Sequence, residues 1–548
     1  MSAHMLLDGL EIRFDQLGGS RLIEHYYAGN AELGTFYAGF PWSLDAFVRR
    51  AEQVERAFHS ERRNALRSAV TATTPAAAHK LEQIAAGNGF VITTGQQAGL
   101  FGGPLYTAYK ILTAVKLAQR LEEALAVPVA PLFWIPADDH DWAEINHAVV
   151  VDAQNQIVRI ELKGSAEPPV SMARRRLGDS VGAALARLES ALPKNDFANA
   201  QLARLSTVYQ PAASVASAFG GWIAETFQAF DLLITSSNDP ALKAHALPVF
   251  RRELERADVH ARLLRTQTDR LLAAGYHEQV AISADAANVM FEDEHGRERL
   301  VREAGGWLVR RTRRTFSHQD VLRMLEAEPD RFSANVLLRP VIESYSFPTL
   351  AYVGGPAEIS YFGQIGCLFS AHEVAMPLVL PRASADLVES KIRKVLDKFQ
   401  LEPSDLRRPF HEIASQIARD ELPDAVRAAL HQLREDVTNG YAGLVAAAQG
   451  IDVTLRGPLE SARNASHKHV EDAERKILNH LKKQNEIGLD QLRKASIHLY
   501  PDGERQERVL GTIGYLGRYG DELLAAIAEA LDVQLDIAVT GWDGVRCA

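Results

Sequence analysis

A histidine surrounded by carboxylates is the part of this sequence best suited to acid–base chemistry. Directly after the apolar residues 129–135 come Asp138, Asp139, His140 and Asp141. Because neighbouring carboxylates repel one another, the cluster implies a bound cation, a basic partner or a shifted pKa. Asp141 also stands three residues before a glutamate, the spacing of a helix capping box, so part of the cluster has a structural explanation. His140 is therefore the better catalytic candidate, with Asp138 or Asp141 to hold it.

The same cluster fits a second kind of enzyme. Asp138, His140 and Asp141 could bind a divalent metal ion and activate a water molecule, as in a metal-dependent hydrolase. Asn146 follows closely and is a candidate contact to substrate or nucleotide.

A glycine-rich loop joins a predicted strand, residues 90–92, to a predicted helix that starts near Pro104. Glycines let backbone N–H groups approach a ligand, and the start of a helix attracts anions. The loop contains neither a GxxxxGK[ST] nor a GxGxxG motif, and close packing alone also explains such glycines. The predicted contacts to an anionic substrate or nucleotide are Gln96, Gln97, Gly103, Tyr106 and Lys110.

A second loop, after the predicted strand 350–353, has the same plan. Two glycines and a proline precede Glu358 and Tyr361 at a predicted helix start. Glu358 either complements the helix dipole or binds the ammonium group of a substrate. Arg339 and Arg382 are predicted to follow core strands and to bind substrate or nucleotide, because ligands of open α/β sheets lie at the carboxyl ends of strands.

The predicted strands and helices indicate an α/β protein with a parallel sheet and insertions. Further core strands are predicted at residues 231–235, 336–338 and 377–380. The predicted segments are 1–149 (first half of the core with N-terminal helices), 150–230 (helical insertion), 231–279 (core strand and helices), 280–334 (small β-rich insertion), 335–390 (second half of the core), 391–500 (coiled-coil arm) and 501–548 (a C-terminal segment packed on the core or the arm).

A heptad-like pattern begins near residue 422. Leu430, Leu433, Val437 and Leu444 recur at coiled-coil spacing, and a similar register continues from Val470. Two long helices joined by a turn at residues 450–458 therefore predict an antiparallel coiled coil. An apolar edge left over on this arm would suit a homodimer, or an interaction protein without catalytic activity.

Composition narrows the class of protein. The 548 residues carry a formal net charge of −10, which argues against a nucleic-acid partner. Two distant cysteines, Cys367 and Cys547, make neither a disulfide framework nor a CxxC metal site and fit a reducing cytoplasm. No apolar run is long enough to span a membrane, and the N-terminus lacks a secretory signal pattern.

Five stretches of the chain, in order, resemble the bacillithiol synthase family, BshC. They are TTGQQAGLFGGPLYTAYK (93–110), WIPADDHDWAEINH (134–147), NVLLRPVIESYSFPTLAYVGGPAEISYFGQ (335–364), MPLVLPRAS (376–384) and LYPDGERQER (499–508). The resemblance implies a ligase that joins cysteine to the amine of glucosaminyl malate by an amide bond, the last step of bacillithiol biosynthesis. It also implies a Rossmann-like core with insertions and a long coiled coil.

The resemblance leaves the cofactor unassigned, with ATP and magnesium as one candidate. The HxGH and KMSKS signatures of the related class I nucleotidyltransferases are absent from the sequence, which argues against straightforward adenylate chemistry. Within this reaction His140, held by Asp138 or Asp141, is expected to assist loss of the amine proton. Lys110 is expected to reach a bound anion.

Overall fold

The structure is a computed structural model that describes residues 5–7, 9–58, 60–164, 168–303, 305–533, 535 and 546–547. The chain divides into two compact units: unit 1 comprises Met1–Leu387 and Glu507–Ala548, and unit 2 comprises Val388–Gln506. Of the two cysteines, Cys367 is a free thiol, whereas the Cys547 side chain lies outside the described part. Among the described helices, none combines the length and apolar character needed to cross a bilayer.

Unit 1 is built on a sheet of six described strands in the order β15-β14-β4-β5-β8-β3. Only β3 is antiparallel to its neighbour. If β4, β5, β8, β14 and β15 are numbered 1 to 5 in chain order, their order across the sheet is 3-2-1-4-5 from β8 to β15, as in a Rossmann fold. The switch point lies between β4 and β14. The predicted Rossmann-like α/β class is thus confirmed. The strands are β3 (Thr71–Ala72), β4 (Phe90–Gly95), β5 (Val129–Ile135), β8 (Leu233–Ser236), β14 (Thr349–Gly354) and β15 (Leu378–Pro381).

The core strands form where the sequence is continuously apolar. Each residue of β4, β5, β14 and β15 is buried, as expected for a parallel sheet covered on both faces. The predicted strand 129–135 is confirmed as β5. The predicted strand 336–338 is wrong, because the Asn335 side chain accepts the Leu337 and Leu338 N–H groups and turns the chain into a helix.

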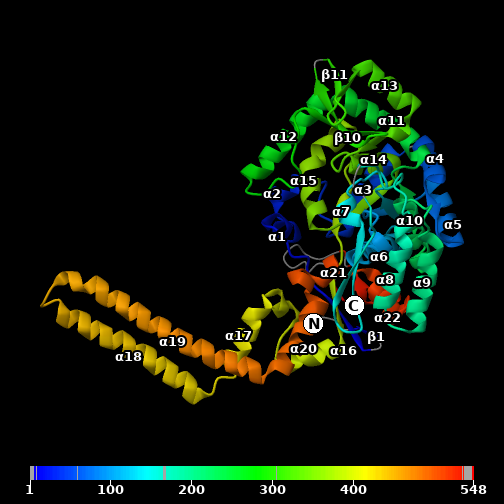
Figure 1. Cartoon of the computed structure of the whole chain (residues 1–548). Coiled ribbons are helices and arrows are strands. Elements are labelled where there is room, and N and C mark those ends of the chain that lie inside the picture. The colour runs from blue at the N-terminus through cyan, green and yellow to red at the C-terminus, as the bar shows by residue number, and fades with distance from the viewer. Residues whose placement is uncertain are drawn as a thin grey trace. The chain divides into compact units, whose positions relative to one another are not determined.

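Helices surround the sheet in Figure 1. α6 packs on β4 and β5, and α15 packs on β14 and β15. The helices of unit 1 up to β15 are α1 (Arg21–Tyr27), α2 (Ala31–Gly34), α3 (Leu44–Ala57), α4 (Ser60–Ala69), α5 (Pro75–Ala85), α6 (Tyr106–Leu125), α7 (Trp142–Ile145), α8 (Ser180–Ala191), α9 (Asp196–Val208), α10 (Val215–Thr226), α11 (Pro240–Glu255), α12 (Ala257–Ala273), α13 (His318–Ala327), α14 (Arg339–Ser346) and α15 (Pro356–Ala371).

Two insertions leave the core. The first, predicted to be helical, begins instead with an antiparallel hairpin of β6 (His147–Val151) and β7 (Ile157–Glu161) before α8, α9 and α10. Its β-branched residues explain the hairpin. The second is a sheet of five described strands in the order β12-β11-β10-β9-β13, with α13 beside it (Figure 1). These strands are β9 (Ala286–Asp293), β10 (Gly296–Glu303), β11 (Gly306–Val309), β12 (Arg314–Ser317) and β13 (Phe332–Ala334).

The two ends of unit 1 add short elements. At the N-terminus β1 (Met5–Leu7) pairs antiparallel with β2 (Leu10–Phe14). The C-terminal segment contains α22 (Thr512–Tyr519), α23 (Glu522–Ala530) and the strand pair β17 (Leu531–Asp532) and β18 (Arg546–Cys547). The elements that cross the unit boundaries are β16 (Ala385–Glu389) and α21 (Gln506–Val509).

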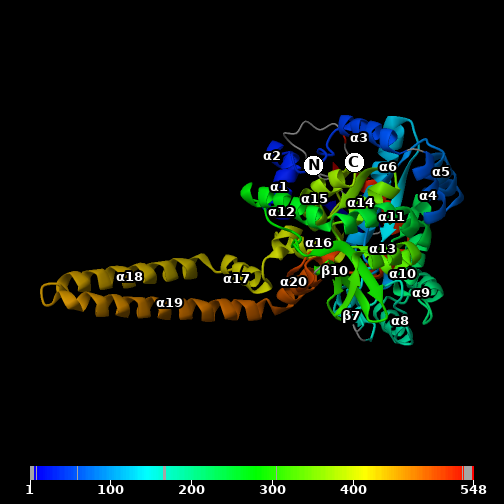
Figure 2. The same ribbon diagram turned by 90° about the horizontal axis from the view of Figure 1, so that it is seen from above.

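Unit 2 contains the predicted coiled coil. α18 (Asp424–Ala448) and α19 (Arg456–Gln484) lie side by side along their length in Figures 1 and 2. Cross-helix bonds such as Tyr441 to Ser466, 3.0 Å, show that they are antiparallel. Leu430 and Val470 are buried between them, but Leu433 and Leu444, predicted at the seam, remain 45% and 50% exposed. The other helices are α16 (Ser390–Lys398), α17 (Phe410–Asp420) and α20 (Glu486–Leu499).

Candidate active site

A cavity of about 680 Å³ opens at the carboxyl ends of the parallel strands. The residues that directly follow all five of these strands line it: Gln96 after β4, Pro136 after β5, Ser237 after β8, Gly355 after β14 and Arg382 after β15. The cavity thus lies at the edge where a Rossmann sheet binds its ligands, around the switch point between β4 and β14. Its size suits a small-molecule substrate.

The structure brings most of the predicted site residues into this cavity. Those that line it are Gln96, Gln97, Tyr106, Lys110, Asp138, His140, Arg339, Glu358, Tyr361 and Arg382. Three predicted residues do not line it. The Gly103 carbonyl accepts the Thr512 N–H, the Asp141 side chain caps α7, and the Asn146 side chain contacts His147.

The glycine-rich loop owes part of its composition to packing. Gly102 has φ +94°, and a Cβ there would come within 2.2 to 2.8 Å of the Trp222 ring. At Gly95 a Cβ would lie 2.6 Å from the Trp134 carbonyl oxygen. Close approach of backbone to neighbouring groups therefore explains these two glycines. The ligand-facing part of the loop is limited to Gly95, Gln96 and Gln97.

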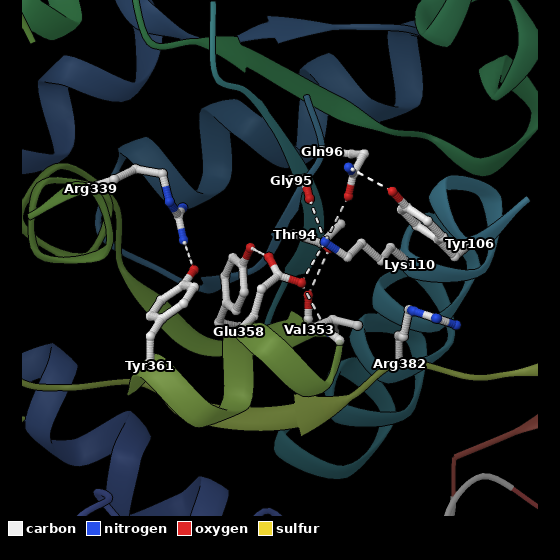
Figure 3. Close-up of polar contacts among 12 residues, drawn as sticks. Thr94, Gly95, Gln96, Tyr106, Lys110, Arg339, Val353, Glu358, Tyr361 and Arg382 are labelled. Carbon is white, nitrogen blue, oxygen red and sulfur yellow. Dashed lines mark hydrogen bonds and ion pairs between the residues drawn. The ribbon is translucent and has the colours of Figure 1, made fainter. Parts of the chain in front are cut away.

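Lys110 lies inside the cavity wall and does not extend into solvent. Its ammonium group donates to the Gly95 carbonyl at 2.9 Å and to Gln96 Oε1 at 3.0 Å, and it pairs with Glu358 Oε2 at 2.5 Å (Figure 3). An ammonium group has three hydrogens, so these acceptors use them all. Burial is the main cause that lowers the pKa of Lys110, and the Glu358 charge opposes it.

Glu358 caps a helix, one of the two roles considered from the sequence, and its ammonium partner belongs to the protein. It accepts the Gly355 N–H at 2.8 Å, which caps α15, and it also binds the Lys110 ammonium and the Tyr352 hydroxyl. Burial by itself would raise the pKa of Glu358, but these partners outweigh it and hold the pKa below its usual range. The ammonium that Glu358 binds is thus one supplied by the protein.

The two arginines predicted to bind anions are both held by carboxylates. Arg339 is the first residue of α14, not the residue after a strand, and it donates to Glu343 at 2.7 Å and to the Tyr361 hydroxyl at 3.1 Å. Arg382 follows β15 as predicted and makes two hydrogen bonds to Glu507, at 3.0 and 2.8 Å. Arg382 and Glu507 are buried, so this pair fixes the wall of the cavity.

Asp138 does not hold His140. Both Asp138 oxygens lie on the Lys243 ammonium, at 3.0 and 2.9 Å, and Lys243 is a buried residue of α11. Asp141 accepts the Glu144 N–H at 3.3 Å. The three groups of the proposed metal site therefore point to different partners, which removes the geometric support for a hydrolase centre of Asp138, His140 and Asp141.

The nearest partner of the His140 ring is Arg297, a buried residue of β10. The guanidinium NH1 of Arg297 lies 3.1 Å from His140 Nδ1, whereas the nearest Asp139 oxygen is 3.7 Å away. Burial, followed by the Arg297 charge, lowers the pKa of His140. The imidazole is therefore neutral at pH 7.

The second insertion supplies basic groups to the cavity that were not among the residues predicted from the sequence. Arg297 and Arg299 on β10 line the cavity beside Asn335. Because side chains two apart on a strand share a face, their spacing was an available signal. Arg299 is half-buried, and within the described part of the chain it has no hydrogen-bond or ion-pair partner.

The cavity carries more positive than negative charge. Among the described lining residues, seven are lysine or arginine and four are aspartate or glutamate. The carboxylates Asp139 and Glu144 are linked by the Gln97 amide, which bonds to both. Burial raises the pKa of Glu144. The arrangement suits a ligand with several anionic groups and one ammonium group.

Among the described residues, one buried cluster has the geometry closest to a metal site. Glu253, His260 and His372 converge within 4.8 Å, away from the cavity. Glu253 Oε2 lies 2.5 Å from His260 Nδ1 and 3.3 Å from His372 Nε2, and Oε1 accepts two N–H groups of Asn288. Four donors thus surround one carboxylate, which is the geometry of a hydrogen-bonded buried anion.

Comparison with known proteins identifies both parts of the chain. Residues 7–383 match the family model described as "Bacillithiol biosynthesis BshC, N-terminal Rossmann-like domain". Residues 385–535 match "Bacillithiol biosynthesis BshC, C-terminal coiled-coil domain".

Individual relatives share about a third of the sequence. A protein of Salinibacter ruber is 34% identical over 442 residues, 80% of each chain. A protein of Chlorobaculum tepidum is 30% identical over 82% of each chain. One of Koribacter versatilis is 30% identical over 93% of this chain and 95% of its own. All three are named "Putative cysteine ligase BshC". The chain therefore belongs to the BshC family of bacillithiol biosynthesis.

Proposed function

We propose that this protein is a ligase that joins the carboxyl group of L-cysteine to the amine of glucosaminyl malate, the last step of bacillithiol biosynthesis. The observation that carries the proposal is the basic cavity at the carboxyl ends of five parallel strands, within the domain that matches the BshC family model. The names of the relatives support a cysteine ligase.

The basic residues that line the cavity suit the malate part of the acceptor, which carries two carboxylates. Arg299 supplies a guanidinium group with no partner among the described residues, and a guanidinium binds a carboxylate through two parallel N–H donors. Arg297, two residues away on the same strand, adds positive charge. Arg299 is therefore our first choice for the malate contact.

The carboxylates Asp139 and Glu144 in the same cavity suit the amine. An ammonium group must lose a proton before its nitrogen can attack a carboxyl carbon, and a positioned base typically contributes about a hundredfold to ten-thousandfold in rate. Glu144 lines the cavity, and its raised pKa makes it a better proton acceptor than an ordinary carboxylate. We assign acceptance of the amine proton to Glu144. The Gln97 amide bonds to both Glu144 and Asp139 and so links the two carboxylates.

Amide formation from a free carboxylate needs an activating co-substrate, because the elements of water must be expelled. ATP with magnesium is the candidate. Within the described cavity, Asp138 is bonded to Lys243 and Glu358 to Lys110, so neither offers free oxygens to a magnesium ion. No step is assigned to a metal held by protein ligands.

The test is direct product formation. Purified protein is incubated with cysteine and glucosaminyl malate, with and without ATP and magnesium, and the thiol product is followed by mass spectrometry. We expect the cysteinyl amide to form and serine to be used poorly. Glu144→Gln should lower kcat at least about a hundredfold, whereas Glu123→Gln, at an exposed position on α6, should not. No product under either condition would refute the proposal.

We also propose that the protein is a cytoplasmic homodimer joined through the coiled coil. The exposed Leu433 and Leu444 of α18 support an apolar contact surface. Light scattering after size exclusion should give twice the monomer mass, and Leu433→Glu with Leu444→Glu should give the monomer mass. An unchanged mass in the double variant would exclude this surface.

A further inference from the structure

Arg297 is fixed by three hydrogen-bond acceptors, and one of them is His140. Its other two acceptors lie on β13. Arg297 Nε donates to Ser333 Oγ at 2.8 Å, and Arg297 Nη2 donates to the Ala334 carbonyl at 2.8 Å. Nη1 then lies 3.1 Å from His140 Nδ1. Because Arg297 is buried and held at two other points, it cannot easily turn away from the imidazole.

This contact determines the protonation state of the imidazole. A guanidinium group has only donors, so Nδ1 must be the acceptor and must carry no hydrogen. The proton of the neutral ring is then on Nε2. An imidazolium would place N–H against N–H at 3.1 Å, and a flipped ring would place a carbon atom opposite the guanidinium.

The other charged groups around His140 do not reverse this state. They are Asp139 and Asp141 of the same loop and Glu292 of β9. Asp139 is occupied elsewhere, because one of its oxygens accepts the His140 backbone N–H at 2.7 Å and the other accepts from Gln97. The Asp139 oxygen remains 3.7 Å from Nδ1, outside hydrogen-bond distance.

The Nε2 side of the ring is available to a ligand. The His140 side chain lines the cavity and is 32% exposed. No described side chain bonds to Nε2.

We propose that His140 acts as a neutral hydrogen-bond donor from Nε2 to the acyl oxygen of cysteine, and that Arg297 is the positioning residue that keeps it in this state. The inference rests on the proposed function for the identity of the acyl oxygen. When the amine nitrogen adds to the carbonyl carbon of a cysteine activated with a phosphoryl group from ATP, the C=O π pair moves to the oxygen and negative charge develops there. When that pair returns to re-form C=O, the C–O bond to the phosphoryl leaving group breaks and the amide remains. The Nε2–H donor stabilises that charge, as in an oxyanion hole.

His140 thereby differs from the base that the sequence suggested. A nitrogen that already holds a hydrogen has no lone pair to accept another proton. The proton released by the amine goes to a carboxylate of the cavity, assigned above to Glu144, and His140 neither gains nor loses one.

The protonation state can be measured without any substrate. Long-range ¹H–¹⁵N NMR of protein labelled in histidine distinguishes the two neutral tautomers and the imidazolium, and the His140→Gln spectrum identifies the His140 signals. We expect the Nε2–H tautomer at pH 7 to 8. A hydrogen on Nδ1, or an imidazolium at pH 7, would overturn the inference whether or not the proposed reaction is correct.

Activity separates a donor from a base. Glutamine places an amide N–H near the position of Nε2–H but cannot act as a base, so His140→Gln should keep kcat within about tenfold of the wild type, whereas His140→Ala should lose about a hundredfold to a thousandfold. Equal losses in the two variants would overturn the donor role.

Arg297→Met tests the positioning role. If the variant melts as a folded protein, the His140 signals should shift toward a mixture of tautomers and titrate at higher pH. Unchanged His140 signals would exclude Arg297 as the positioning residue. Should the variant not fold, the His140→Gln and NMR results still decide the main claim.

Discussion

Replacing Lys110 with methionine should destabilise unit 1, because the ammonium group is part of a buried network. The Lys110 and Glu358 side chains are 5% and 19% exposed, and all three ammonium hydrogens have acceptors. Removing one member of a buried ion pair typically costs about 3–5 kcal/mol, since the other charge is left uncompensated. In Lys110→Met, Glu358 would retain the Gly355 N–H and the Tyr352 hydroxyl, so we expect the lower end, about 3 kcal/mol.

The change in melting temperature follows from the loss of free energy of unfolding and the number of residues in unit 1. Its two segments contain 387 and 42 residues. With an unfolding entropy of about 2.1 cal/mol/K per residue, a loss of about 3 kcal/mol lowers the melting temperature by about 3 °C.

A double-mutant cycle shows whether the pair is the cause. Lys110→Met with Glu358→Gln should cost less than the sum of the single variants by at least about 1 kcal/mol, because no uncompensated charge remains. Arg120→Met, at an exposed ion pair on the same helix, is the control and should change stability by less than about 0.5 kcal/mol. Additive single effects, or a Lys110→Met loss as small as that of the control, would refute the reasoning.

Three other variants examine separate parts of unit 1. Arg299→Met removes the charged contact to malate and should raise the KM for glucosaminyl malate at least about tenfold to a hundredfold. The melting temperature should stay near that of Arg310→Met, an exposed control. An unchanged KM would exclude the malate contact. Glu253 has a pKa lowered to about 2 by its two histidine partners against the effect of burial, so it contributes about 3 kcal/mol that is present above pH 4.5 and lost as the pH falls toward 2. In Glu253→Gln, urea unfolding should give a lower free energy of unfolding at pH 6 and a smaller decrease in that free energy between pH 5 and pH 3 than in the wild type. An equal decrease in the variant would contradict the lowered pKa of Glu253. Gly102→Ala would force a Cβ into a buried indole ring at positive φ and should cost about 3 kcal/mol, whereas Gly182→Ala on α8 meets open space and should be neutral or stabilising; equal melting temperatures would contradict the packing argument.

The sequence predicted the core strands well where length and apolar character agree. The apolar runs that form β5 and β14 are typical of strands buried on both faces in a parallel sheet. The run at 336–338 has three residues, too few to separate a strand from a helix start, and the Asn335 side chain decides for the helix. On α18, Leu433 and Leu444 have heptad spacing, but a pair of helices buries only a narrow seam.

The candidate site was predicted in its location but not in its pairing. The loops after β4, β5 and β14 do face one cavity. The partners that determine what each group can do come from distant parts of the chain: Lys243 for Asp138, Arg297 for His140 and Glu507 for Arg382. Local patterns carry no information on such contacts, because they depend on how the insertion and the C-terminal segment fold back onto the core.

The pair of Arg382 and Glu507 has a consequence for the order in which the protein is made. Arg382 precedes all of unit 2 in the chain, and Glu507 follows it, so 119 residues separate the two segments of unit 1. At translation rates of about 5–20 residues per second, the ribosome needs roughly 6–24 s to reach Glu507 after the last core strand has been synthesised. During that time the nascent core carries an arginine whose partner does not yet exist. The wall of the cavity is therefore completed only at the end of synthesis, and a chain released before Glu507 would lack it.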